Sequence, residues 1–83
     1  MKHARSDYNR IQDPQNIIPD DEPVFLIRAQ DIVSGDAVRE WANLHLKAGG
    51  TTEIANAAIK HAELMDKWHT KKNADAPIKE LIK

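Results

Sequence analysis

The stretch EPVFLIRAQD, from Glu22 to Asp31, decides how this 83-residue chain is expected to fold, because it holds the longest apolar run, Val24 to Ile27. The acidic residues Asp20 to Glu22 suit the positive end of a helix dipole, and Pro23 is tolerated in a first helical turn. These start signals predict a helix from about Glu22 to Ile32. A buried strand is the rival interpretation, since periodicity cannot separate a short apolar run in a helix from one in a strand.

Two further helices are predicted downstream, each with signals at its ends. The first covers Ser34 to Ala48, with the serine as its N-cap and a Gly-Gly pair as its left-handed stop. The second is Ala-rich and covers Glu53 to about Thr70, capped by one of the two threonines before it. A short C-terminal helix is predicted after Asp75, where a proline suits the first turn.

Both downstream helices have an apolar face when residues are placed about 100° apart. The first face holds Val38, Trp41, Ala42, Leu44 and Ala48, and the second holds Ile54, Ala57, Ala58, Leu64, Met65 and Trp68. His45 and His61 fall within these faces. The small alanines of the second helix allow a neighbouring helix to approach closely, and that neighbour could come from another chain.

Residues 1–20 are polar and interrupted by Pro14 and Pro19, so they are predicted to form an extended N-terminal arm without regular structure. Residues 21–83 are predicted to form the helical domain. The expected fold class is therefore all-α: a small bundle of three main helices, with the arm before it and a short C-terminal helix after it.

Composition narrows the classes of function. The chain has no cysteine, so disulfides cannot stabilise a core this small, and a homo-oligomer is expected. Twelve basic and thirteen acidic residues give a formal charge of −1 without a basic stripe, which disfavours DNA or RNA binding. No apolar run approaches the roughly 20 residues of a membrane span. The N-terminus lacks the apolar segment of a secretory signal, so a cytoplasmic location is expected.

Arg28, Gln30 and Asp31 form the first candidate ligand-binding site, at the polar end of the apolar stretch. An arginine buried there would need a carboxylate, a carbonyl or an anionic ligand, because an unpaired buried guanidinium is very unfavourable. Two interpretations remain open. Arg28 pairs with Asp31 or Asp36 and completes the fold, or it binds a phosphate or carboxylate of a ligand.

His45 and His61 form the second candidate, because they lie near Trp41 and Trp68 and could contact a planar ligand. A neutral core histidine with one hydrogen-bond partner is the favoured alternative for each. No metal site is expected: His61 and His69 are eight residues apart and no nearby cysteine or carboxylate completes a zinc spacing. No nucleophile motif is present, so neither an enzyme nor a cofactor is expected.

Five segments of the chain form a distinctive set: Tyr8-Asn9-Arg10-Ile11-Gln12-Asp13, Asp21-Glu22-Pro23-Val24-Phe25-Leu26-Ile27-Arg28-Ala29-Gln30-Asp31, Val38 with Trp41-Ala42, Ala48-Gly49-Gly50, and His61-Ala62 with Met65 and Trp68. In these segments the chain resembles a group of small proteins associated with bacteriophages, prophages and bacterial genomes. The segments extend over about Tyr8 to Trp68. By analogy with small phage proteins that lack enzymatic motifs, the resemblance suggests sequestration by binding.

Two functions are therefore expected. The first is a phage-type anti-defence sponge: a homo-oligomer in the host cytoplasm that sequesters a nucleotide-derived signalling molecule at its interfaces. Its expected ligand-binding residues are Arg28, Gln30, Asp31, Tyr8, Arg10, Trp41, His45 and His61. The alternative is a protein–protein interaction module, an adaptor or inhibitor of a host protein that docks a helix face or the N-terminal arm. A virion or scaffold component is a third, weaker option.

Overall fold

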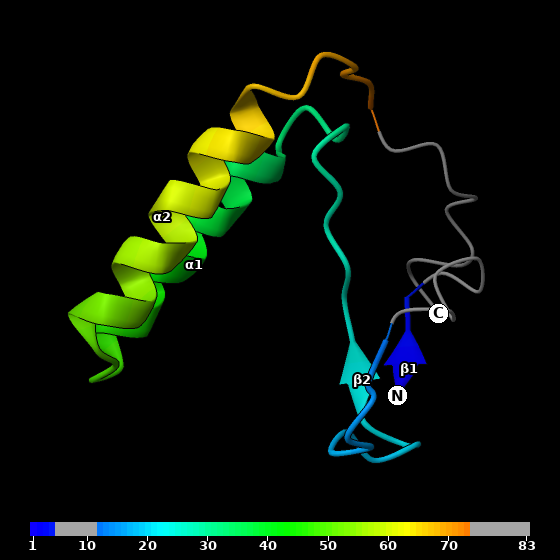
Figure 1. Cartoon of the computed structure of the whole chain (residues 1–83). Coiled ribbons are helices and arrows are strands. Elements are labelled where there is room, and N and C mark those ends of the chain that lie inside the picture. The colour runs from blue at the N-terminus through cyan, green and yellow to red at the C-terminus, as the bar shows by residue number, and fades with distance from the viewer. Residues whose placement is uncertain (5–11, 74–83) are drawn as a thin grey trace. The chain divides into compact units, whose positions relative to one another are not determined.

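The computed structural model describes residues 1–4 and 12–73, which contain two strands and two helices (Figure 1). In chain order these are β1 (Lys2–His3), β2 (Pro23–Val24), α1 (Ser34–Lys47) and α2 (Thr52–Asp66). The described residues belong to two compact units, one with residues 1–4 and 12–26 and one with residues 27–73. Tyr8, Arg10 and the predicted C-terminal helix lie outside the described residues.

The first unit contains a two-stranded parallel sheet, in which Lys2 pairs with Pro23 and His3 with Val24. The Lys2 amide donates a hydrogen bond to the Glu22 carbonyl at 2.7 Å. Pro23 is the first residue of its strand, a position where a proline is tolerated. The prediction that residues 1–20 carry no regular structure is wrong at Lys2–His3.

The helix predicted from Glu22 to Ile32 is absent, so the described chain contains two helices and not three. Only Pro23–Val24 of this stretch is a strand, and Phe25 is 70% exposed, which also rules out a buried strand. β-Branched and aromatic side chains lose rotamer freedom in a helix, which weakens helix formation here. Further along, the Gln30 carbonyl accepts a hydrogen bond from the Lys72 amide at 2.7 Å instead of from a helical neighbour.

The second unit contains α1 and α2, which lie side by side as a hairpin (Figure 1). Thr51 caps α2 as predicted, its hydroxyl accepting from the Ile54 amide at 3.3 Å. Ser34 does not cap α1: it is the first helical residue, and its hydroxyl instead donates to the Ala29 carbonyl at 3.4 Å. At the turn, Gly49 has a φ of +92°, the left-handed conformation expected of a glycine stop.

Alanines form the contact between the two helices. Ala42 of α1 and Ala55 and Ala62 of α2 are fully buried, with Met65 nearly so. Such small side chains let two helix backbones approach closely, and here the close neighbour is in the same chain. We call this contact the alanine seam. It contains few large side chains, and most of the large apolar residues of both helices remain exposed.

Within the part of the chain that the structure describes, no helix has the length and apolar character needed to cross a membrane.

Candidate functional site

The structure places Arg28 at the surface, not in a buried environment. Its side chain is exposed and makes no hydrogen bond or ion pair with any described residue. The two partners considered for it are engaged elsewhere: the Asp31 carboxylate accepts from the Val33 amide at 3.0 Å, and Asp36 pairs with Arg39. The prediction of a buried Arg28 is therefore wrong, because it depended on a helix that does not form.

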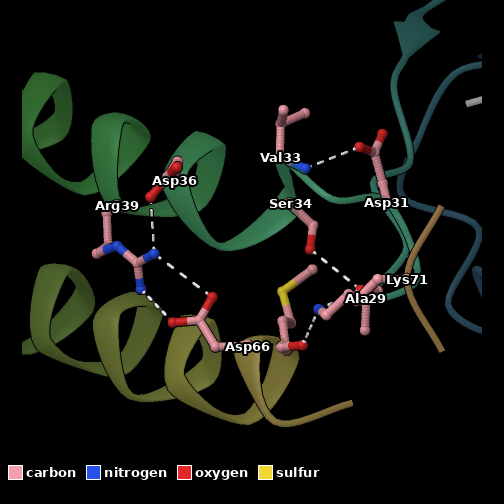
Figure 2. A network of polar contacts seen from close by, with 9 residues as sticks. Ala29, Asp31, Val33, Ser34, Asp36, Arg39, Asp66 and Lys71 are labelled. Atoms are coloured by element: carbon pink, nitrogen blue, oxygen red, sulfur yellow. Dashed lines mark hydrogen bonds and ion pairs between the residues drawn. The ribbon is translucent and has the colours of Figure 1, made fainter. Parts of the chain in front are cut away.

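Arg39, not Arg28, is the arginine that links parts of the fold. Figure 2 shows its guanidinium between two carboxylates, 2.8 Å from Asp36 within α1 and 2.7 Å from Asp66 at the end of α2. The hydrogen bond from Arg39 lowers the pKa of Asp66, and the hydrogen bonds to both carboxylates raise the pKa of Arg39. The spacing of Asp36 and Arg39 was visible in the sequence as a helical i, i+3 pair. Asp66 was not, because it is 27 residues away.

Gln30 and Asp31 belong to a junction between the segment before α1 and the segment after α2. The Gln30 carbonyl accepts from the Lys72 amide, and the Ile32 amide donates to the Lys72 carbonyl at 3.1 Å. Beside them, the Lys71 ammonium donates to the carbonyls of Ala29 at 2.7 Å and Met65 at 2.5 Å (Figure 2). The polar groups at this junction mainly hold the two ends of the hairpin together.

Trp41 and His45 are brought into contact on α1. Their rings stack with centroids 5.0 Å apart and an angle of 18° between the planes. The Nε2 atom of His45 is buried and has no hydrogen-bond partner among the described residues. Gly50 lies against the same ring, close enough that an added Cβ would overlap Nε2. His61 is exposed on α2.

Most of the large exposed apolar residues of the two helices gather on one side of the hairpin; Leu46, which is 42% exposed, lies near the seam on the other side. On each helix, a rotation of about 120° around the helix axis separates these residues from the residues of the alanine seam. The sense of this rotation is the same on both helices when each helix is viewed from its N-terminus toward its C-terminus. Because the two helices are antiparallel, the same sense of rotation brings both sets to the same side. We call this surface the apolar face; its residues are Ala37, Trp41, Leu44 and His45 of α1 and Ile54, Ala57, His61 and Leu64 of α2.

The large side chains of the apolar face are only partly covered. Trp41 is 50% exposed, Leu44 53%, Ile54 49% and Leu64 64%. The opposite side of the hairpin is mainly polar and carries the ion pair between Arg39 and Asp66. The hairpin is therefore amphipathic as a unit. Each helix was predicted to be amphipathic, but the joining of the two faces into one surface follows only from the antiparallel packing.

Comparison with known proteins found no matching family model, no matching curated protein and no matching solved structure. Among residues 1–4 and 12–73, no group of three or more histidine, aspartate or glutamate side chains could hold a metal ion. The apolar face is thus the candidate functional site that the described residues define best.

Proposed function

We propose that this chain is a non-enzymatic binding protein whose helical hairpin is a protein–protein interaction module that binds through the apolar face. The observation that carries the proposal is that four large apolar side chains, each about half exposed or more, lie on one side of two adjacent helices. Contiguous apolar patches of this kind on soluble domains mark interaction sites. Trp41 would be the main anchor, since buried tryptophans contribute strongly to binding at interfaces.

The rigidity of the hairpin supports the proposal. The alanine seam, the Arg39–Asp66 pair and the Lys71 hydrogen bonds hold both helices in place before any partner arrives. A preorganised surface loses less conformational entropy on binding than a flexible segment does. The hairpin face is for this reason favoured over the N-terminal arm as the docking element.

Photo-crosslinking in the producing cell tests the proposal. A photoreactive amino acid at Leu64, on the apolar face, is expected to form a covalent adduct with another polypeptide after irradiation. The matched control places the same amino acid at Glu63, which lies on the opposite side of α2 and is expected to give little adduct. Absence of any polypeptide adduct at Leu64, with the chain folded, would refute the proposal.

Nucleotide sequestration at an oligomer interface is the second candidate function. It is favoured by the stacked pair of Trp41 and His45, because the half-exposed Trp41 offers a planar aromatic surface. Stacking on an aromatic side chain is common in the recognition of a base. Calorimetry and thermal shift against cyclic nucleotides and ADP-ribose derivatives test it. If the chain binds a member of this panel, Trp41→Leu should weaken that binding, and no binding of any member would exclude this candidate.

A further inference from the structure

We propose that the partner of the apolar face is a second copy of this chain, packed face to face with the turns of both hairpins at the same end. This inference rests on the proposed function and names the partner. The product is an antiparallel four-helix bundle with two helices from each copy.

Each hairpin encloses too little core of its own. The seam between α1 and α2 buries three alanines and Met65, while Trp41, Leu44, Ile54 and Leu64 stay about half exposed or more. A two-helix layer has one apolar side to cover, and an identical layer of the same shape can cover it. Four-helix bundles are built from such amphipathic pairs.

The outer edges of the hairpin, meaning the edge of each helix farthest from the other, carry a regular pattern of charge. On α1 this edge carries Glu40 and Lys47, and on α2 it carries Glu53 and Lys60. None of the four forms an ion pair within the described part of the chain. Lys47 and Glu53 lie near the turn, and Glu40 and Lys60 each lie seven residues further from it.

The charge pattern separates the two ways in which two hairpins can stack. With both turns at the same end, α1 of one copy lies beside α2 of the other, so Glu40 meets the second copy's Lys60 at equal height and Lys47 meets its Glu53. With the turns at opposite ends, α1 lies beside α1, so Glu40 meets Glu40 near the middle of the helix, and Lys60 likewise meets Lys60. Edge charges of this kind set partner orientation in helix bundles. Opposite charges favour the first arrangement and like charges disfavour the second.

Sedimentation equilibrium of the full chain tests whether the partner is a second copy of the chain. A dimer is expected, with Leu44→Glu shifting the chain to monomer and the adjacent polar-face substitution Asn43→Glu leaving it dimeric. Glu40→Lys and Lys60→Glu should each raise the dimer dissociation constant about five- to tenfold, since each replaces two symmetric attractive contacts by repulsive ones. The double substitution Glu40→Lys/Lys60→Glu should restore the wild-type value, while Glu63→Lys on the polar face should not change it.

Thiol crosslinking tests the arrangement, because the chain has no cysteine of its own. Residues on the outer edges of neighbouring helices lie too far apart for a disulfide, whose Cα atoms are at most about 7 Å apart, so a short bismaleimide crosslinker is used. With this crosslinker the double variant E40C/K60C is expected to form a covalent dimer, and E40C alone is not. Rapid covalent dimerisation of E40C alone would overturn the same-end arrangement. If the chain is monomeric at all concentrations, the proposal that a second copy covers the apolar face is wrong. This holds whether another part of the chain or a foreign protein covers the face. If Leu64 then crosslinks to a foreign protein, the proposed function survives while this inference fails.

Discussion

The contact between Gly50 and the His45 ring leads to a prediction about the turn of the hairpin. A Cβ at position 50 would overlap three ring atoms of His45, namely Cε1, Nε2 and Cδ2. The ring cannot move aside freely, because it stacks against Trp41. Gly50→Ala should therefore lower the free energy of unfolding by about 1–3 kcal/mol, the usual effect of overpacking. For a domain of this size the melting temperature would fall by roughly 4–24 °C.

The assay is chemical and thermal unfolding followed by helical circular dichroism, in the wild-type and His45→Ala backgrounds. Removing the imidazole removes the overlap, so Gly50→Ala should have little effect in the second background, and the coupling energy should be about 1–3 kcal/mol. Gly49→Ala is the matched control: its Cβ would meet nothing within 4 Å, but its φ of +92° strains any other residue. Its effect, about 1–2 kcal/mol, should be equal in both backgrounds. An equal effect of Gly50→Ala in both backgrounds would refute the reasoning.

Three further predictions concern the seam, the ion pair and the junction. Ala62→Leu should lower the free energy of unfolding by about 1–3 kcal/mol, because the seam has no room for a larger side chain. Denaturant titration measures this free energy, and an unchanged unfolding midpoint would contradict the close packing. Arg39 lowers the pKa of Asp66 in the folded state. The pair therefore stabilises the fold at pH values above the ordinary carboxyl pKa of about 3.8. This stabilisation is lost as the pH falls through the lowered pKa. Arg39→Ala should return the pKa of Asp66 toward that value in an NMR titration of its side-chain carboxyl carbon, and an unmoved pKa would argue against the pair. Lys71→Met removes the ammonium that bonds two carbonyls, so hydrogen exchange at the Ile32 amide should become several-fold faster, and an unchanged rate would show that the junction holds without it.

The proposed bundle gives the alanine seam and the apolar face separate roles. The seam sets the distance between the two helices of one chain, and the apolar face supplies the large side chains that a core of useful size requires. In this bundle the second copy covers Trp41 and Leu64, which a single 83-residue chain without cysteine leaves half exposed or more. The ends of the hairpin are then held by the polar junction around Lys71.

By itself, the sequence determines the two long helices, the threonine cap and the glycine stop between them. Helical periodicity and caps are local: they depend on residues within a few positions of one another. The same local signals were misleading at EPVFLIRAQD, where acidic residues and a proline resemble a helix start. The main-chain groups of Gln30 and Ile32 bond instead to Lys72, about forty residues away.

Only the tertiary structure decided which charged and apolar residues act together. Arg39 and Asp36 form a pair within one helix, but the pairing of Arg39 with Asp66 depends on a contact 27 residues distant. Likewise, the apolar faces of α1 and α2 were each visible in the sequence, whereas their joining on one side required the antiparallel packing of the alanine seam. Long-range contacts and the sense of helix rotation are properties of the folded chain, and no local pattern encodes them.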